Sequence, residues 1–403
     1  MTAAHDPSSA RAGGPALGAL VWLAVATFSM GIDGYVLAGL LPQIADDLRV
    51  DPSAAGQLMA VFALTSALAG PVLSALTGGW ERKTTIVGAL AVFVVGNLVV
   101  ALAPTYAVAM LGRVVSALGG ALLNAVISAY VIARTPPERR GRALSLVLGG
   151  WLAATALGVP LGLLLGQSDW RIPLFLVVLV GSAALLGIVA RVPRLRLPAR
   201  TLRETLRPLR EPLLLAGLLV PTGIMCASYL CFTYATLIVG PRVGGAAVMI
   251  VVMFAYGLLS LLGNVVSGRL TDRFHPVPVI TGILAVLGAA AVLGAAGLTL
   301  PGALGSAAAI AWFFACAMGN GGSGVPLQAR LSAMAPESAA LVLALNGSAM
   351  ALGSGLGSAL GGAALGVGVA PDHLLFLSAA VLAVTFAVHL LIGRRTPAAA
   401  LAR

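Results

Sequence analysis

"LGALVWLAVATFSMGIDGYVLAGLL", residues 17 to 41, is an apolar stretch that nevertheless carries one carboxylate, Asp33. About 20 apolar residues in a helix cross a hydrocarbon core roughly 30 Å thick, so this stretch has the length of a membrane span. It is too long for a secretory signal and has no clear small-residue cleavage site before Asp33. We therefore interpret it as a retained first membrane helix.

Similar apolar runs recur along the whole chain of 403 residues, which is 59% hydrophobic and 9% charged, with a mean hydropathy of +1.02. A water-soluble globule cannot bury that much apolar surface. We predict an all-α polytopic membrane protein in which little chain remains for a soluble domain. The expected transmembrane helices are twelve: residues 17–41, 56–77, 84–103, 106–132, 142–166, 171–190, 213–239, 246–270, 277–298, 303–327, 338–366 and 372–392.

The distribution of positive charge predicts the orientation of these helices. If the N-terminus lies inside, cytoplasmic segments hold 20 of the 24 Lys and Arg residues, outer loops hold Arg49, Arg171 and Arg242, and Arg113 lies within the membrane. Both termini are then cytoplasmic, in a bacterial cytoplasmic membrane. The net charge of +11 therefore reads as an orientation signal and a contact for anionic lipid headgroups, and nucleic acid is not an expected partner.

A charged linker divides the chain into two similar parts. "RVPRLRLPARTLRETLRPLREP", residues 191 to 212, holds seven Arg and four Pro, and predicts an N-terminal half at 1–190 and a C-terminal half at 213–403. The halves resemble each other at a spacing near 194 residues, as in transporters built from two parallel repeats of six helices. Thus "SALTGGWERK" (74–83) corresponds to "SGRLTDRFHP" (267–276), and Tyr35 to Tyr229, whereas Asp33 corresponds to Ala227.

Asp33 is the one acidic residue that we expect deep inside a membrane helix. It would lie ~12 Å below the outer interface, and Arg113, on the antiparallel fourth helix, ~10 Å below the same interface. An unpaired ionised carboxylate there costs several kcal/mol, so Asp33 should be protonated, paired or facing water. We predict that Asp33 carries a proton and that Arg113 is its electrostatic partner. The alternative is a static ion pair that holds helices together.

Helical spacing predicts which side chains share a face with these charges and could line a substrate pocket. Aromatic and Met side chains with few polar groups suit a small amphipathic compound, uncharged or cationic. Plain helix packing would explain each residue singly. The candidates for substrate binding are Met30, Leu37, Asn124, Met225, Tyr229, Phe232, Asn346 and Met350.

Small residues in the fifth and eleventh predicted helices indicate close helix contacts. Gly158 and Gly162 clear one face of the fifth helix, and Pro160 frees a backbone carbonyl and favours a kink. The run from Gly353 to Gly361 repeats this pattern in the eleventh helix. We expect these two faces to form the contact between the halves. The three cysteines lie in predicted spans and are expected to be packing residues, with neither a metal nor a cofactor indicated.

One motif favours a different class of protein. "GGSG" (321–324), with His389 in a later span, resembles the arrangement of an intramembrane serine protease, in which Ser323 would be the nucleophile. Such four-residue matches are common in a chain with 50 Gly, and a protease does not explain twelve spans in two repeats. The sequence therefore favours a transporter over an enzyme.

Three motifs resemble the major facilitator superfamily, and specifically its twelve-helix drug:proton antiporter branch. "LGRVVSALGGA" (111–121) is similar to the buried-arginine motif of that branch, with Arg113 as the arginine. "GVPLG" (158–162), followed by "DWR" (169–171), resembles its antiporter motif. "GRLTDRF" (268–274) resembles the cytoplasmic gate motif, which implies gating roles for Asp272 and Arg273.

Asp33 in turn resembles the helix-one acid of bacterial exporters of chloramphenicol-like drugs, sugars and purine nucleosides. The resemblance implies proton-driven export by a protein that we expect to be a monomer, with a proton-coupled importer or a passive facilitator as the competing interpretation. One motif departs from the family, because Gly78 and Gly79 occupy positions that usually hold Asp and Arg. Either Asp272 and Arg273 then carry the inward gate, or Glu81 substitutes.

Overall fold

The computed structural model describes residues 17–197, 210–335 and 338–395. Within these residues, twelve helical segments are long and apolar enough to cross a membrane, which confirms the predicted all-α multi-pass fold. Of the predicted linker, residues 198–209 lie outside the described part. The first six spans are α1 (Leu17–Val36) continued by the 3₁₀ turn η2 (Leu37–Leu40) and α2 (Leu41–Leu48), α3 (Pro52–Leu76), α4 (Arg82–Ala101), α5 (Tyr106–Arg134), α6 (Arg140–Ala153) continued by η4 (Ala154–Gly158) and α7 (Val159–Leu165), and α8 (Ile172–Arg191).

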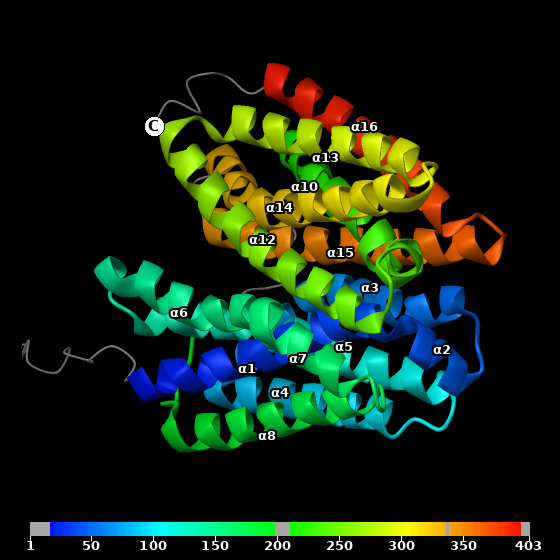
Figure 1. Cartoon of the computed structure of the whole chain (residues 1–403). Helices are drawn as coiled ribbons and strands as arrows, with labels where there is room; N and C mark the ends of the chain where they lie inside the picture. The colour runs from blue at the N-terminus through cyan, green and yellow to red at the C-terminus, as the bar shows by residue number, and fades with distance from the viewer. Residues whose placement is uncertain (1–16, 198–209, 336–337, 396–403) are drawn as a thin grey trace, which may run out of the picture.

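The second six spans follow the linker. They are α10 (Pro212–Phe232), α12 (Ala246–Arg273), α13 (Pro276–Leu298), α14 (Gly302–Met334), α15 (Ala339–Gly366) and α16 (Leu374–Arg395). Short helical turns complete the chain: η3 (Pro137–Arg139), α11 (Ala235–Ile238), η6 (Gly240–Arg242) and η8 (Pro371–His373). Figure 1 shows the N-terminal six spans below and the C-terminal six above, with α1 beginning and α16 ending at the same end of the bundle. We call this end the terminal side.

Local sequence explains where several spans begin. Proline stands in the first turn of α3, α8, α10 and α13, where its missing N–H costs no helical hydrogen bond and its fixed φ favours the helix. Glu81 caps α4 by accepting from the backbone N–H groups of Lys83 and Thr84. These signals are local, which is why the starts of the spans lie close to their predicted positions.

Pro160 modifies the fifth span as a proline inside a helix should. It follows a π-helical turn, η4, in which the backbone adopts i→i+5 hydrogen bonds before α7 resumes the ordinary pattern. Because proline has no N–H, the carbonyl one turn earlier cannot receive its usual hydrogen bond, and the wider turn accommodates the change. The fifth span thus contains a π bulge directly before Pro160.

The two halves meet on the side opposite the termini. Gln57 Nε2 of α3 donates to the carbonyl oxygen of Ala359 of α15 at 3.3 Å, and the rings of Tyr35 and Phe232 lie 5.8 Å apart. A Cβ on Gly257 of α12 would lie 2.6 Å from the carbonyl oxygen of Thr155 in η4. The contact between the halves is therefore built by α3 with α15 and by α12 with the η4 turn and α7.

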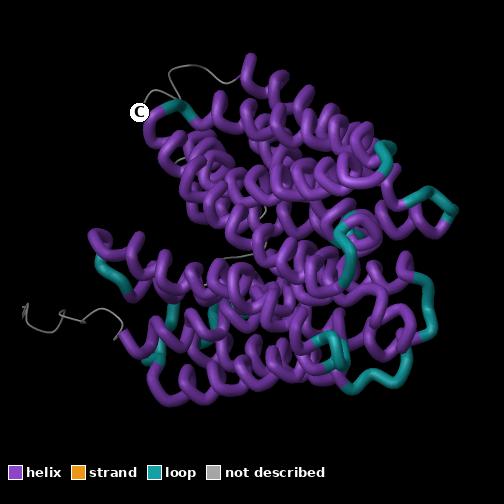
Figure 2. Tube along the Cα trace, viewed as in Figure 1, coloured by secondary structure: helices purple, strands orange, loops and turns teal. Residues whose placement is uncertain are grey.

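Toward the terminal side the halves separate. Gly268 lies on the same face of α12 as Gly257, eleven residues further along, yet a Cβ added there would meet no atom within 4 Å. Gly149 of α6 is equally open. Figure 2 shows the helices of the two halves diverging in this direction. This conformation is closed on one side of the bundle and open on the terminal side.

Three predicted boundaries were wrong. The first span extends beyond residue 41 to Leu48. The seventh span ends at Phe232 instead of residue 239, since the chain turns at Thr233 and Tyr234 into the short α11. The tenth span extends beyond residue 327 to Met334 and includes Arg330, whose side chain is only 1% exposed. The predicted topology placed Arg330 in a cytoplasmic segment, whereas the fold buries its side chain inside the C-terminal half.

Candidate functional site

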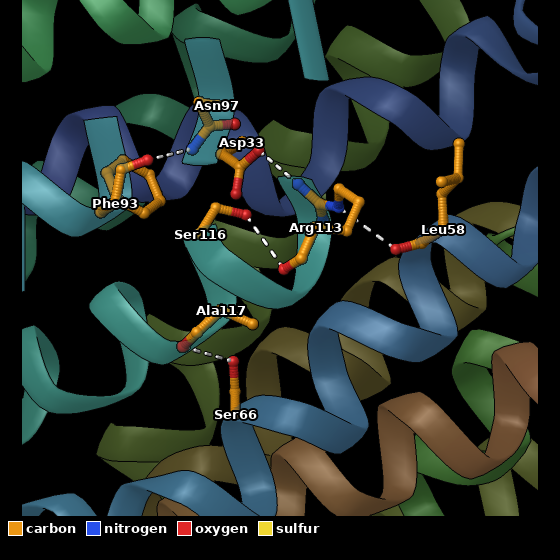
Figure 3. A network of polar contacts seen from close by, with 8 residues as sticks. All are labelled: Asp33, Leu58, Ser66, Phe93, Asn97, Arg113, Ser116 and Ala117. Carbon is orange, nitrogen blue, oxygen red and sulfur yellow. Dashed lines mark hydrogen bonds and ion pairs between the residues drawn. The ribbon is translucent and has the colours of Figure 1, made fainter. Parts of the chain in front are cut away.

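Asp33 and Arg113 form a buried ion pair between α1 and α5. Arg113 Nη1 lies 2.6 Å from Asp33 Oδ1, and the side chains are 1% and 0% exposed, respectively. The two residues are far apart in sequence and belong to antiparallel spans, so the pair depends on both lying at one depth in the bundle. Figure 3 shows the two side chains pointing toward one another from their helices. The structure thus brings together the two charges that the sequence placed at a common depth.

Arg113 has two further partners, both on α3. Its Nε donates to the carbonyl oxygen of Leu58 at 3.2 Å, and its guanidinium carbon lies 4.2 Å from the centroid of the Phe62 ring. A cation over an aromatic face is attracted by the ring quadrupole, more strongly where water is excluded. These contacts hold the guanidinium in place independently of the carboxylate.

Asp33 is less completely satisfied than Arg113. Its second oxygen, Oδ2, is buried and has no hydrogen-bond partner in the described part of the chain. Asn97 of α4 lies beside it (Figure 3), with its amide nitrogen donating to the carbonyl oxygen of Phe93 at 3.1 Å and its own Oδ1 unpaired. A buried carboxylate oxygen without a donor costs free energy unless a proton or a water satisfies it. The site therefore offers one position at which a proton can be held.

The charge state of Asp33 must affect the ion pair. Arginine stays protonated in proteins, so only the carboxyl can change its charge here. A buried ion pair stabilises little in total, but removing the charge of one partner leaves the other buried and uncompensated. Protonation of Asp33 would consequently weaken the attachment of α1 to α5, and the arrangement can convert a proton into a change in helix contacts.

The residues predicted to bind substrate divide between the two halves. In the N-terminal half, Met30 and Leu37 are buried and Asn124 is exposed. Met30 lies close to Arg113's partner Phe62, since both approach a Cβ placed on Gly120 within 3.7 Å. The structure thus brings Met30 close to Phe62, while no hydrogen bond from the Asn124 side chain is found within the described residues.

In the C-terminal half, two predicted residues join an aromatic cluster and the others do not. Tyr229 and Phe232 lie 5.5 Å apart, centroid to centroid. Met225 is buried against Gly353 of α15. Asn346 Nδ2 contacts the sulfur of Met350 at 3.6 Å, with Oδ1 unpaired and buried. Met225, Tyr229 and Met350 all belong to or pack against one apolar cluster of this half.

The aromatic cluster crosses from one half to the other. Phe232 packs against Tyr35 of α1 at 5.8 Å and against Tyr256 of α12 at 5.0 Å, and Tyr35 packs against Trp151 of α6 at 6.2 Å. The Tyr256 hydroxyl accepts a hydrogen bond from Asn320 Nδ2 at 3.0 Å. Of this cluster, helical spacing predicted only Tyr229 and Phe232, because the other rings come from spans whose rotation cannot be determined from spacing alone.

The glycines at four-residue spacing pack within the halves, contrary to expectation, whereas Gly355 of the same run in α15 packs against Leu64 of α3 in the other half. A Cβ on Gly158 would lie 2.5 Å from Ile32, and one on Gly162 would lie 2.6 Å from Val36, so both glycines let the fifth span pack closely on α1. Pro160 is buried in the same helix. In the same way, Gly353 and Gly357 clear space for α10. Small residues allow close helix approach, and the fold uses it to assemble each half.

The predicted gate residues occupy different situations. Asp272 and Arg273 are exposed at the end of α12, and no ion pair between described residues involves either. Arg273 lies over the ring of Phe274 at 5.5 Å. Glu81 does not reach the other half: its Oε1 accepts from the backbone N–H of Leu195 at 2.9 Å, which attaches the start of the linker to the N-terminal half.

The protease interpretation fails on geometry. Ser323 Oγ donates to the carbonyl oxygen of Asn320 in its own helix at 2.8 Å. His389 is engaged elsewhere, with Nδ1 2.7 Å from Arg330 Nη1 and Nε2 2.9 Å from Thr281 Oγ1. A serine nucleophile needs a base within hydrogen-bond reach, and both ring nitrogens of His389 are already engaged by other residues.

Two residues near the ion pair were missed by the sequence analysis. Asn97 is a polar side chain, 0% exposed, in an otherwise apolar span, and that polarity was a usable signal. Phe62 gave no signal in the sequence, because an aromatic residue is common in a membrane helix and its neighbours in the fold were not known. Across the described ranges, no group of three or more His, Cys, Asp or Glu side chains could hold a metal ion.

Comparison with known proteins is consistent with this architecture. The chain is 34% identical over 278 residues to a chloramphenicol resistance protein of Streptomyces lividans, covering 67% of this chain and 71% of that protein. It is 28% identical to the putative transporter AraJ of Escherichia coli K12, over 92% and 94% of the two chains. It is 26% identical to the inner membrane transport protein YdhP of the same strain, over 94% and 96%.

The family model described as Major Facilitator Superfamily matches residues 23–358, which include the ion pair and spans from both halves. The family consists of membrane transporters and not enzymes. With twelve spans, a contact between two six-helix halves and relatives that are named transporters, the chain belongs to the Major Facilitator Superfamily.

Proposed function

We propose that this transporter exports a small amphipathic organic compound in exchange for protons, with Asp33 as the proton carrier and Arg113 as its electrostatic partner. The observation that carries the proposal is the fully buried ion pair, 2.6 Å long, in which one carboxylate oxygen has no donor among the described residues. Intramembrane ionisable groups are costly and commonly serve transport. The corresponding position in the C-terminal half is Ala227, so the repeat itself does not require an acid there.

The proposed direction of transport is supported by the distribution of basic residues and by the name of one relative. Basic residues concentrate on the terminal side, which the positive-inside rule assigns to the cytoplasm of a bacterial inner membrane. The open conformation then faces inward, as an exporter awaiting its cargo would. The Streptomyces lividans relative is a chloramphenicol resistance protein, and this favours export over import.

The substrate class is supported by the side chains near the contact between the halves. Tyr35, Tyr229, Phe232 and Met30 offer aromatic and thioether surface, and the charge of Asp33 is balanced by Arg113. Such surroundings suit an uncharged or weakly basic compound with an aromatic or other apolar part. We expect the protein to act as a monomer without a cofactor.

Proton-coupled transport is tested with the variant Asp33→Asn in liposomes. Chloramphenicol and a panel of nucleosides and sugars serve as probes under an imposed pH gradient. We expect wild-type protein to move one of these compounds against its gradient while protons flow the other way. Asp33→Asn should retain the fold and lose at least about a hundredfold of coupled flux, because the side chain can no longer exchange a proton.

Asp46→Asn is the matched control, since Asp46 is an exposed carboxylate at the end of the same span. It should transport like the wild type. Undiminished gradient-driven flux in Asp33→Asn would refute the role of Asp33. Flux in the direction of the proton gradient would make the protein an importer, and flux without dependence on the gradient would make it a facilitator.

A further inference from the structure

A groove of about 420 Å³ runs along the C-terminal half between α12 and α13, with α14 as its floor. These two helices are consecutive but touch little, and Met318, Gly319 and Gly322 of α14 line the bottom of the space between them. Ser267 is the one hydroxyl among the lining residues. The lining residues are Gly263, Val266, Ser267, Leu270, Phe274, Pro278, Val279, Gly282, Ile283, Val286, Met318, Gly319 and Gly322.

The groove faces away from the other half of the protein. Gly257, which contacts the N-terminal half, lies on nearly the opposite face of α12 from Gly263 and Leu270. Several lining side chains are strongly exposed, among them Phe274 at 51% and Val286 at 54%. In a protein whose spans cross a bilayer, an exposed apolar groove on this face is filled by lipid chains and not by water.

Its length matches one leaflet of the bilayer. From Gly263 to Phe274, the lining residues of α12 cover ~16 Å of helix, and the hydrocarbon core is roughly 30 Å thick. Phe274 lies at the end of α12 on the terminal side, and Gly263 lies near the middle of that span. The groove thus extends from the membrane surface to about the midplane, the depth reached by a single acyl chain.

The mouth of the groove carries positive charge. Arg273 precedes Phe274 at the end of α12 and is exposed. Asp272, the neighbouring acid, lies on the opposite face of α12 from the lining residues, so it faces away from the mouth.

We infer that this groove is a binding site for an anionic phospholipid from the leaflet on the terminal side. One acyl chain lies in the groove between α12 and α13, and the phosphate lies at Arg273. Basic residues between membrane helices at the membrane surface bind anionic headgroups, which accounts for the charge, and the apolar lining accounts for the chain. This site is separate from the ion pair and does not depend on the direction or coupling of transport.

The apolar part of the site is tested by filling it. A Cβ on Gly282 would meet no atom within 4 Å, and Gly282 lines the groove, so Gly282→Leu begins in open space and fills part of the groove. Gly288→Leu is the matched control, because Gly288 lies on the same helix, is equally open and does not line the groove. The full-length protein is purified in detergent, mixed with phosphatidylglycerol or phosphatidylcholine, and analysed by native mass spectrometry.

The charged part is tested by Arg273→Gln, with Arg142→Gln on the terminal end of α6 as an exposed control in the other half. We expect wild type, Gly288→Leu and Arg142→Gln to retain phosphatidylglycerol in preference to phosphatidylcholine. Arg273→Gln should bind phosphatidylglycerol about fivefold more weakly, the effect of one basic residue near a lipid surface. Gly282→Leu should lose both lipids.

Three results would overturn the inference. Gly282→Leu retaining phosphatidylglycerol like the wild type would remove the groove as the site. Equal retention of the two lipids, with no effect of Arg273→Gln, would remove the preference for an anionic headgroup. Conversion of a dimer to a monomer by Gly282→Leu, with lipid binding unchanged, would assign the groove to a second copy of the chain.

Discussion

The two halves solve one structural problem alike, with the charges reversed. On the side opposite the termini, Arg171 of the N-terminal half pairs with Asp47 at 2.8 Å, and its Nη2 donates to the carbonyl oxygen of Ala103. In the C-terminal half, Arg242 Nη1 lies 3.1 Å from Asp372 Oδ1, and its Nη2 donates to the carbonyl oxygen of Leu298.

These pairs occupy matching places in the repeat. Arg242 and Leu298 each lie about 195 residues after Asp47 and Ala103. The arginine comes from the last loop of one half and from the first loop of the other. In each half, an ion pair therefore joins the first loop to the last loop on the side opposite the termini, and the arginine of the pair also binds the end of the third span. Which of the two loops supplies the arginine and which the aspartate does not matter.

The interiors of the halves are not alike. The N-terminal half has Asp33 and Arg113 as an acid and base pair near the contact between the halves, whereas the C-terminal half has Arg330 hydrogen-bonded to His389 near the terminal side. A feature that the repeat preserves despite reversed charges serves the fold. A feature present in one half only, at a cost in buried charge, is the better candidate for transport.

The largest loss of stability is expected from replacing the arginine of the buried ion pair. Arg113→Leu leaves Asp33 buried without its partner, which should destabilise the protein by about 3–5 kcal/mol. Thermal unfolding in detergent, followed by intrinsic fluorescence, measures the change. Adding Asp33→Leu to this variant should recover most of the loss, because two apolar side chains replace an ion pair at little cost.

The same double variant separates a static pair from a proton carrier. It should be stable and inactive in proton-driven transport. A stable double variant that still transports against a gradient would show that the pair only joins α1 to α5, and the contrast between the two interiors would lose its functional meaning.

The sequence predicted the spans and the depth of this pair because both depend on length and hydrophobicity. Counting 1.5 Å per residue placed Asp33 and Arg113 at one level, and the fold brings them into contact. It could not predict Phe62 or the Leu58 carbonyl beside Arg113, since these depend on how α3 is rotated. Nor could it assign the glycine faces, because close packing within a half and between halves has the same spacing.

The next effect concerns the interior of the C-terminal half. Arg330 donates to His389 Nδ1, so the histidine is neutral there and its Nε2–H donates to Thr281 Oγ1. His389→Leu removes the acceptor of a buried guanidinium and should destabilise by about 1–3 kcal/mol. Thr281→Val, which removes only the distant end of the chain of hydrogen bonds, should cost about 1 kcal/mol.

Both variants are measured by thermal unfolding and by proton-driven transport. If the C-terminal interior serves the fold alone, coupling should persist in each once the loss of stability is allowed for. Abolished coupling in a folded His389→Leu protein would extend the proton pathway into the second half.

A smaller effect is expected at the outer ion pairs, which are partly exposed. Arg171→Ala should destabilise the protein by about 0.5–1 kcal/mol, as should Arg242→Ala in the other half. Exchanging the charges within one half, as Asp47→Arg with Arg171→Asp, should restore part of the loss by giving that half the sign pattern of its partner. Unfolding at low and high salt measures these differences, and an exchange no more stable than either single variant would contradict the equivalence of the halves.

The smallest effect is expected at Glu81, which joins the linker to the N-terminal half and corresponds in the repeat to Phe274, a residue without a carboxylate. Partial burial raises the pKa of Glu81. Hydrogen bonds from the N–H groups of Leu195 and Lys83 and from Thr84 lower the pKa by more than burial raises it, so that it falls to about 2. Because the carboxylate is bound more tightly in the folded protein, its contribution is complete above the ordinary pKa near 4.5 and is lost as pH falls toward 2. Limited proteolysis of the linker should therefore accelerate between pH 4.5 and 2 in the wild type, assayed with an acid-active protease. In Glu81→Gln, cleavage at pH 5 should already be faster than in the wild type, and its rate should change less between pH 4.5 and 2. If the two proteins instead show the same dependence of cleavage on pH, the linker is held only by its hydrogen bonds from the Arg82 N–H and the Tyr130 hydroxyl.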